Sequence, residues 1–581
     1  MTGFRTLAAL TIATILYVGS AANAATTYYV SPTGHDTSTG TIGTPFLTIG
    51  KAIAVSSSGD TIMVNDGTYK STGNVDLSVT APITITSING AGSTVIDCGG
   101  THAAFAISGG TSGTPIVLKG LTIQNGLGPN SITGSVTLSS AYAQITNCRL
   151  VNNQPNSALQ VDGLSNCSVT GCVFAGNVSD SGGAIRNNGT LSITSSIFNG
   201  NRGASDGGAL YNGGTATIYQ TTFDGNSCPG GGGAIDNLGT ITMSNCLLHG
   251  NRGSAAGGGI YSIATANLSF CSILGNTSGQ GGGIWNDNPG SLTVKNCLIA
   301  SNQASSGGGC GNNGTSHIYY TTIAANVTEG DGAGDVEVND AAGTFVDDII
   351  WGNTTGLDLN ANVHTVITNC DHNSNSIATN SFNADPQYVD PANGDFSLKA
   401  TSPCRHAAIT VSGITTDLKG RPRSTSTPTM GAYEGGTGGE FQFTASAAGP
   451  DGVERDLWQG ISDDAGYVAL WRVVPPANPT ATHKFTATNL GRPLFIACGP
   501  NGHERILFFD SLNWKTTIWD VANDFSFSTV TLGPNLSTVP TAMNVGTDNH
   551  LHVTFTTLTG SVTMYNIATN GTFTTKSYGP Y

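Results

Sequence analysis

The stretch SGGAIRNNGTLSITSSIFNGNRGASDGGALYNGGTATIYQTTFDGN, residues 181–226, repeats one pattern almost twice. Each copy opens with two glycines, a small residue and an apolar residue. The same opening recurs along the chain at steps of 25, 25, 25, 24 and 26 residues. The pairs are Gly182-Gly183, Gly207-Gly208, Gly232-Gly233, Gly257-Gly258, Gly281-Gly282 and Gly307-Gly308. A fixed period of this length indicates a repeat architecture.

A second column, of asparagines, runs in phase with the glycine pairs. An inward asparagine at a tight corner can hydrogen-bond the backbone and its own copy in the next coil, and it tolerates left-handed dihedral angles. We therefore interpret both columns as structural. The asparagines are Asn153, Asn177, Asn201, Asn226, Asn251, Asn276, Asn302, Asn326, Asn353 and Asn375.

Within each repeat, apolar and polar residues alternate with period two, as in residues 191–193 and 292–294. This alternation predicts short strands, about three in each repeat and no helix. Strands that return every 25 residues pair in parallel with the coils above and below. At ~4.8 Å for each coil, residues from about 75 to 400 would make a rod of roughly 60 Å. The prediction is an all-β parallel β-helix solenoid.

Cysteines keep the same register, five residues before a ladder asparagine. Other coils carry serine or threonine at this place, so we expect an inward column of small side chains whose thiols are buried. Cys246, Cys271 and Cys297 should stack in consecutive coils. Paired ligands at metal-site spacing are missing, and no metal is expected. The column contains Cys148, Cys172, Cys246, Cys271, Cys297 and Cys370.

The ends of the chain suggest four parts. Residues 1–24 contain a basic residue, Arg5, then an apolar run, and end in small residues that suit a cleavage site. This is the pattern of a signal peptide, so we expect a secreted or cell-surface protein. Residues 25–434 would be the solenoid, with a lid helix at 46–56 before a strand at 61–64, and an irregular cap from 385 to 434. Residues 435–439 would be a glycine-rich linker.

Residues 440–581 would be a small Trp-rich β-repeat domain of three repeats of about 45 residues. That length is typical of a propeller blade. Three blades do not close a propeller, so a sandwich, an open array or a self-associating module remains open.

Composition narrows the partners. Charged residues are 10% of the chain, against about 25% in average domains. The formal net charge is −15, which argues against nucleic acid and acidic lipid surfaces. After the leader, nothing is long and apolar enough to cross a bilayer, so an integral membrane protein is not expected.

Three segments resemble known families. The opening residues resemble right-handed parallel β-helix proteins of the pectate-lyase-like superfamily, and the closing ones a family of bacterial surface β-helix proteins. Gly-Gly-Ala-Ile and Phe-x-x-Asn in the coils are similar to repeats of chlamydial polymorphic outer-membrane proteins, which are adhesins. The resemblance implies a right-handed helix. The matching residues are Tyr28-Tyr29-Val30-Ser31, Gly59-Asp60-Thr61-Ile62, Gly67-Thr68-Tyr69, Phe198 to Asn201, Phe223 to Asn226, Asp390-Pro391-Ala392-Asn393-Gly394 and Gly431-Ala432-Tyr433-Glu434.

β-Helix enzymes act on polysaccharides in two ways. Lyases use a basic residue and often Ca²⁺, whereas hydrolases use two or three carboxylates. Candidates here are Arg186 and Asp236 in one outward column, and Asp224 and His249 as neighbours in another. Acidic residues bunch at 331–340, where Ca²⁺ could bind. A complete hydrolase set is missing, since the pair at 347–348 lacks its companions.

The position after each Gly-Gly-x-apolar motif should point outward. It reads Arg186, Tyr211, Asp236, Tyr261 and Trp285. Exposed aromatic rings on a flat β face stack on sugars, so the two tyrosines and the tryptophan are the predicted binding residues. We favour a surface or matrix protein, or adhesin, that binds polysaccharides or cell-surface glycans. The alternative is an extracellular polysaccharide lyase or glycoside hydrolase.

Overall fold

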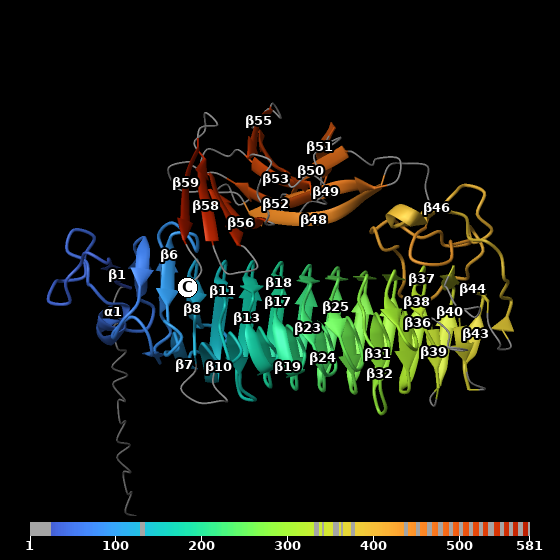
Figure 1. The fold of residues 1–581 in the computed structure, drawn as a ribbon, viewed down its shortest axis with the longest axis horizontal. Coiled ribbons are helices and arrows are strands. Elements are labelled where there is room, and N and C mark those ends of the chain that lie inside the picture. The colour runs from blue at the N-terminus through green and yellow to red at the C-terminus, as the bar shows by residue number, and fades with distance from the viewer. Residues whose placement is uncertain are drawn as a thin grey trace, which may run out of the picture.

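The computed structural model describes residues 25–434, except 128–133, 331–335, 340–341, 353–358, 362–363 and 374–377, and beyond 440 the backbone of twelve strands. The predicted leader at 1–24 and linker at 435–439 lie outside the described residues. The main body is one long parallel β solenoid that starts at a small helical lid (Figure 1).

The lid is α1 (Ile49–Val55), inside the predicted segment 46–56. Thr48 caps it, because its hydroxyl accepts a hydrogen bond from the backbone N–H of Lys51 at 3.2 Å. Ile49 and Ala52 are its buried residues, and the next strand begins at residue 61 as predicted.

Each central coil passes through four parallel sheets, here numbered in chain order. Strand β10 runs through both sheet I and sheet IV. Sheet I contains β1 (Thr27–Val30), β2 (Thr61–Val64), β5 (Thr84–Ser87), β8 (Ile116–Lys119), β10 (Val136–Thr146), β13 (Asn166–Thr170), β17 (Thr190–Thr194), β21 (Thr215–Tyr219), β25 (Thr240–Ser244), β29 (Thr265–Ser269), β32 (Ser291–Lys295), β36 (Thr315–Tyr319), β40 (Gly343–Val346), β43 (Val366–Thr368) and β45 (Ala378–Thr379). Sheet II contains β3 (Gly67–Tyr69), β6 (Thr94–Asp97), β9 (Thr122–Gln124), β11 (Arg149–Val151), β14 (Val173–Ala175), β18 (Ile197–Asn199), β22 (Thr222–Asp224), β26 (Leu247–His249), β30 (Ser272–Leu274), β33 (Leu298–Ala300), β37 (Thr322–Ala324), β41 (Ile349–Trp351) and β44 (Asp371–His372).

Sheet III is short and present only in the middle coils, whereas sheet IV follows the whole rod. Sheet III contains β15 (Val178–Ser181), β19 (Arg202–Asp206), β23 (Ser227–Cys228) and β27 (Arg252–Gly253), with β34 (Gln303–Ala304) and β38 (Val327–Thr328) further on. Sheet IV contains β4 (Leu77–Val79), β7 (Phe105–Gly109), β10, β12 (Leu159–Val161), β16 (Ile185–Asn187), β20 (Leu210–Asn212), β24 (Ile235–Asn237), β28 (Ile260–Ser262), β31 (Ile284–Asn286), β35 (Cys310–Asn312), β39 (Val336–Val338) and β42 (Leu359–Ala361).

Identical side chains stack inside the rod. The predicted asparagine ladder forms along the described coils: Asn201 Nδ2 donates to Asn226 Oδ1 at 2.9 Å, and Asn226 Nδ2 donates to Asn251 Oδ1 at 2.9 Å. Asn353 and Asn375 lie outside the described residues. The rings of Phe198 and Phe223 stack 4.7 Å apart at 10°. Successive coils are therefore nearly parallel copies with little twist.

The left-handed residue at this corner is not the ladder asparagine, which corrects one detail of the prediction. It is the residue before, as at Gly225 and Gly250, with φ of 61° and 62°. The asparagine thus has ordinary dihedral angles, and its side chain rather than its backbone explains the column.

The cysteine column is buried as predicted. Cys246, Cys271 and Cys297 lie in consecutive coils and are at most 3% exposed. The Cys271 N–H donates to Cys297 Sγ at 3.3 Å, and burial raises the pKa of the Cys246 and Cys297 thiols. The described cysteines are all free thiols.

The closing segment packs on the outer flank of the last coils, over sheet II. It includes β46 (Tyr388–Asp390), η1 (Pro391–Asn393) and the antiparallel partner β47 (Asp395–Leu398). Phe396 and Met430 pack there with Ala324, whose side chain would otherwise face solvent. The predicted cap therefore covers a side of the rod.

The backbone of the last region forms three four-stranded antiparallel sheets, one in each sequence repeat. How these sheets combine stays a prediction. They are β48 (Glu440–Ala448), β49 (Glu454–Ile461), β50 (Tyr467–Val473) and β51 (Thr480–Thr486); β52 (Arg492–Cys498), β53 (Glu504–Asp510), β54 (Lys515–Val521) and β55 (Phe527–Leu532); and β56 (Pro540–Val545), β57 (Leu551–Thr556), β58 (Val562–Ile567) and β59 (Phe573–Tyr578).

Candidate functional site

Outward side chains from two sheets meet where sheet III turns into sheet IV. The glycine pairs make this turn: Gly207 has φ of 56°, and a Cβ on Gly208 would lie 2.0 Å from the Gly233 carbonyl oxygen. No other residue fits so tight a corner. We call the line of contacting side chains the corner seam. It contains Ser181, Asp206 and Gly231 from the sheet III side, and Arg186, Tyr211, Asp236, Tyr261 and Trp285 from sheet IV.

The sheet IV half of the seam is the predicted outward column. Parallel pairing places Arg186 beside Tyr211, then Asp236, Tyr261 and Trp285 in successive coils. The Arg186 guanidinium lies 5.6 Å from the centre of the Tyr211 ring, within cation–π range. These five predicted residues therefore share one line along the rod.

Two members of the column are buried, contrary to expectation. Trp285 is 3% exposed, because its ring lies against the backbone of the next coil; a Cβ on Gly311 would lie 2.2 Å from two of its ring carbons. Asp236 is also 3% exposed. The expected exposure of Trp285 is thus wrong, whereas Tyr211 and Tyr261 are half-buried.

Tyr261 is held from both sides. Its ring packs on Gly231, where a Cβ would lie 2.8 Å from the ring, and its hydroxyl donates to Asp287 Oδ2 at 3.3 Å. Asn313 Nδ2 donates to Asp287 Oδ1 at 3.0 Å. Burial, helped by the Asp287 charge, raises the pKa of Tyr261 to about 12, so its hydroxyl keeps its proton.

Asp236 lies between the two tyrosines in a dry environment. Its Oδ1 is buried and has no hydrogen-bond partner among the described residues. Burial, with the nearby Asp206 charge as second cause, raises the pKa of Asp236 to about 8. Asp206 differs: it is half-buried and accepts a hydrogen bond from the Ser181 hydroxyl at 2.9 Å. The seam thus holds a protonated carboxyl beside a hydrogen-bonded one.

Asp236→Asn should remove a pH dependence of stability. The pKa of Asp236 is about 8 in the folded protein and about 3.9 in the unfolded chain. The parent is therefore most stable below about pH 3.9, where the carboxyl is protonated in both states, and it loses stability as the pH rises from there to 8. Asparagine does not ionise. We expect the variant to gain on the parent by a few kcal/mol in unfolding free energy between about pH 4 and 8.

Thermal melts of both proteins at several pH values measure this difference. Asp180→Asn is the matched control, because Asp180 is exposed to solvent, and the variant should follow the parent at every pH. Parallel pH profiles of parent and Asp236→Asn would show that Asp236 is ionised in the folded protein at neutral pH.

The other two catalytic candidates lie on a different sheet. Asp224 on β22 and His249 on β26 are paired in register, and Asp224 Oδ1 lies 2.8 Å from His249 Nδ1. Asn199 donates to Asp224 Oδ2 at 3.3 Å. This half-exposed trio follows sheet II, and within the described residues it forms no hydrogen bond or ion pair with Arg186 or Asp236, so the four candidates form two separate pairs. A catalytic role for either pair stays a prediction.

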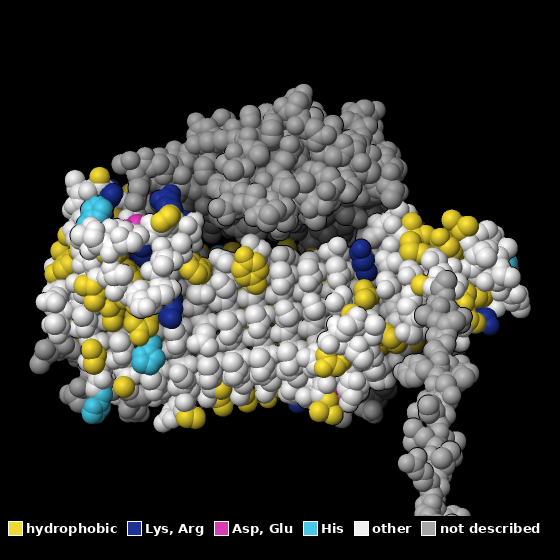
Figure 2. Space-filling view, turned by 180° about the vertical axis from the view of Figure 1, so that it is seen from behind, with side chains coloured by type: hydrophobic (Ala, Val, Ile, Leu, Met, Phe, Trp, Pro, Cys, Tyr) yellow, Lys and Arg dark blue, Asp and Glu magenta, His cyan; other side chains and the backbone are white. Residues whose placement is uncertain are grey.

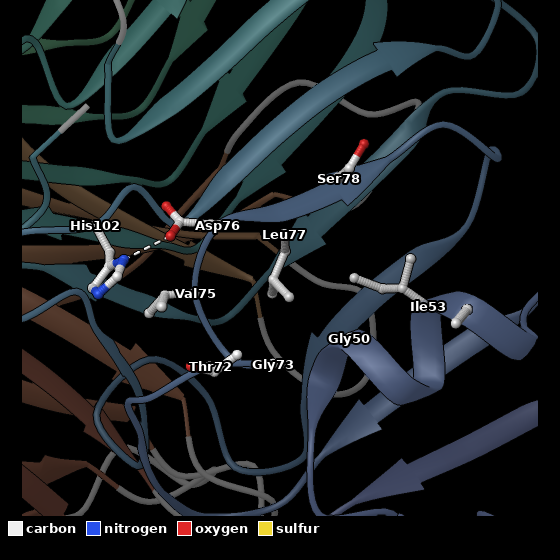
Figure 3. A pocket seen from close by; sticks show the side chains of 10 residues that line it. Gly50, Ile53, Thr72, Gly73, Val75, Asp76, Leu77, Ser78 and His102 are labelled. Atoms are coloured by element: carbon white, nitrogen blue, oxygen red, sulfur yellow. Dashed lines mark hydrogen bonds and ion pairs between the residues drawn. The ribbon is translucent and has the colours of Figure 1, made fainter. Parts of the chain in front are cut away.

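A pocket of about 440 Å³ beside the lid helix was not anticipated (Figure 3). Ile53, Val75 and Leu77 line it, with His102 at one side, where His102 Nδ1 lies 2.6 Å from Asp76 Oδ2. The two residues lie 26 positions apart, about one coil, in coils without the glycine pairs. The repeat period of about 25 residues predicts that Asp76 and His102 lie in neighbouring coils, but neither belongs to a repeated column that would have drawn attention to them.

The described residues were compared with what a metal site and a membrane-spanning helix require. Within the described ranges, no group of three or more His, Cys, Asp or Glu side chains could hold a metal ion. Of the acidic residues considered for Ca²⁺, Asp331, Asp335 and Asp340 lie outside the described residues, and Glu337 accepts a hydrogen bond from Ser306. No helix in the described part is long and apolar enough to span a membrane.

Comparison with known proteins identifies the fold. Residues 83–277 match the family described as right handed beta helix region. The solenoid is a right-handed β-helix. The predicted right-handed parallel β-helix fold is thereby confirmed, and no curated protein matches the chain in sequence.

Three solved structures align with much of this chain at low sequence identity. Pectate lyase Pel9A is 13% identical over 71% of this chain and 96% of its own, with a TM-score of 0.32. XylC in complex with xylose is 10% identical over 70% and 98%, with a TM-score of 0.36. A rhamnogalacturonan lyase is 16% identical over 65% and 95%, with a TM-score of 0.26.

Proposed function

We propose that this β-helix protein acts outside the cell, secreted or at the cell surface, and binds glycan chains along the corner seam. The observation that carries the proposal is the pair of half-buried tyrosines, Tyr211 and Tyr261, two coils apart on one line. Two coils span ~9.6 Å, which suits stacking on rings of a chain that lies along the rod. The leader-like segment at 1–24 supports an extracellular site of action.

The polar groups of the seam favour a neutral glycan. Protonated Asp236 can donate a hydrogen bond to a sugar hydroxyl, and Asp206 and Asp287 can accept one. The Asp206 and Asp287 carboxylates, together with a net charge of −15, would repel a polyuronate. Trp285 supports the seam from beneath in this proposal, and Arg186 flanks it over Tyr211.

Affinity electrophoresis on a panel of neutral and acidic polysaccharides tests the proposal. Tyr211→Ala with Tyr261→Ala should weaken retention by about fivefold to about 150-fold, since each of the two stacked rings contributes about 0.5–1.5 kcal/mol. Tyr219→Ala is the matched control, because Tyr219 is 41% exposed on sheet I, away from the seam. If the double variant migrates like the parent on every polysaccharide that retards the parent, the seam does not bind glycans.

Hydrolysis is the second candidate function, and the two unlike carboxyls favour it. A protonated Asp236 next to Asp206 has the division of roles that glycoside hydrolases need in an acid and its partner carboxylate. The same panel, scored for reducing ends, decides the question. Turnover that disappears in Asp236→Asn and persists in Asp224→Asn would establish this function, and retention without any product would leave binding alone.

A further inference from the structure

The outward face of sheet I carries hydroxyl groups in two straight columns. Each strand from β17 to β32 has a polar residue at its first position and another two residues later, and the strands pair in register. The first column is Thr190, Thr215, Thr240, Thr265 and Ser291; the second is Ser192, Thr217, Thr242, Asn267 and Thr293.

The two columns form a regular and nearly flat lattice. Inside the rod, the rings of Phe174, Phe198 and Phe223 lie in the coil before the array and in its first two coils; they stack 4.8 and 4.7 Å apart and differ in tilt by 4° and 10°. Parallel strands keep about this spacing throughout. The hydroxyl columns therefore repeat at that spacing along the rod. Across the rod, side chains two residues apart lie ~6.6 Å from each other. Sheets that twist in the usual way would not keep such a lattice over five coils.

These hydroxyls face solvent. The side chains are exposed in β17, β21 and β25 and half-exposed in β29 and β32. Within the described part of the chain, no hydrogen bond joins the hydroxyls of Thr215, Thr217, Thr240 or Thr242 to another protein group. The β-branched threonine side chain has few rotamers, so its hydroxyl and methyl group hold fixed positions. The face presents a preset array of water-binding groups.

The face is also free of charge in its centre. Neither column contains Asp, Glu, Lys or Arg, whereas charged residues make up about 25% of average proteins. Figure 2 shows the broad, uncharged flank of the middle coils from behind. At the third outward position the one charged residue of the array is Lys295, on its last strand, and Tyr219 is 41% exposed there. A charged partner would find no complementary group here.

We propose that this threonine face, defined by the two columns, binds ice. The surface of ice is an electrically neutral, regular lattice of water oxygens, and the two columns present a neutral, regular lattice of hydroxyl groups to match it. Waters held by successive hydroxyls can take lattice positions, so part of the entropy cost of ordering these waters is met at the protein surface before contact with ice. A glycan or protein would need rings, pockets or charges, and the two columns offer hydroxyls and one amide.

Strand propensity gives a competing explanation of the columns. Threonine favours strands, and stacked threonine pairs stabilise parallel ladders, whatever lies outside. Strand propensity does not require the hydroxyls to form a flat lattice. A substitution that preserves the strand but disrupts the hydroxyl lattice therefore distinguishes strand propensity from ice binding. Thr217→Lys with Thr242→Lys puts two long charged side chains at the centre of the second column. Thr222→Lys on sheet II is the matched control, because it lies in the next strand, on another face.

The full chain is tested by ice recrystallisation, by thermal hysteresis and by partition into a slowly growing ice hemisphere. We expect the parent and Thr222→Lys to enter the ice and to slow recrystallisation. The double variant should need at least tenfold more protein for the same effect, with its circular dichroism and melting unchanged. Thr217→Ser keeps the hydroxyl and should retain activity. Tyr211→Ala with Tyr261→Ala should also retain it, which separates this proposal from glycan binding at the seam.

Two results would overturn the proposal. One is exclusion of the parent from ice, and the other is equal activity of the parent and the folded double lysine variant. Powders of crystalline cellulose and chitin are included as a parallel arm. Retention there that depends on Thr217 and Thr242, without entry into ice, would assign the face to a crystalline glycan instead.

Discussion

Asn226→Ala should lower the unfolding free energy by about 3 kcal/mol or more, as much as any single interior change in the rod. The side chain is fully buried and bonds in both directions: its Oδ1 accepts from the Asn201 N–H at 3.0 Å, and its Nδ2 donates to the Phe198 carbonyl at 3.0 Å. Alanine leaves that N–H and that carbonyl buried without partners. Each unsatisfied group costs about 1–3 kcal/mol, to which a small cavity adds.

Urea unfolding followed by circular dichroism measures this loss. Asn199→Ala is the control, because Asn199 lies in the preceding coil on the exposed face of sheet II and should change stability by less than about 0.5 kcal/mol. Equal midpoints for the two variants would mean that the ladder follows from the coil geometry and does not stabilise it. The repeat architecture makes the test sensitive, since each coil depends on its two neighbours.

The fold could be predicted because the coils of a solenoid are structurally equivalent, so residues with the same structural role recur at a fixed period in the sequence. Every coil must present the same inward groups at the same corner, so Asn226 and its copies recur at one period. The same register made Asp224 and His249 predictable neighbours, and they lie 2.8 Å apart. Outward residues carry no such constraint beyond their column.

The burial of outward-pointing residues, such as Asp236 and Trp285, could not be predicted from the sequence. The residues of β19 lack alternating apolar side chains, so the period-two pattern does not mark them, and they form a strand of sheet III beyond the three strands predicted for each repeat. That strand and the tight turn after it bring Asp206 to Asp236 and put Gly231 against Tyr261. The packing of Trp285 on Gly311 depends on how the indole ring is turned, whereas the period-two pattern predicts only on which face of the strand a side chain lies.

Arg423→Ala should detach the closing segment from the rod and lower the unfolding free energy by about 3–5 kcal/mol. Arg423 is buried at the contact: its guanidinium lies 4.0 Å from the centre of the Tyr320 ring and donates to Asn296 Oδ1 at 2.7 Å. It also donates to the Gly431 carbonyl at 2.7 Å and forms an ion pair with Glu434 at 3.2 Å. Removing one partner of a buried pair leaves the other charge unpaired, which is the source of the expected cost.

Denaturant unfolding combined with limited proteolysis tests this clamp. Cleavage in residues 385–434 should precede loss of the β signal in Arg423→Ala, because the cap would lose its anchor while the coils keep their ladders. Arg423→Lys should rescue only part of the stability, since an ammonium group cannot reproduce the planar set of donors. Lys399→Ala, an exposed change in the same segment, should behave like the parent. A cap that resists protease equally in Arg423→Ala would show that the apolar contact of Phe396 and Met430 alone holds the segment on the rod.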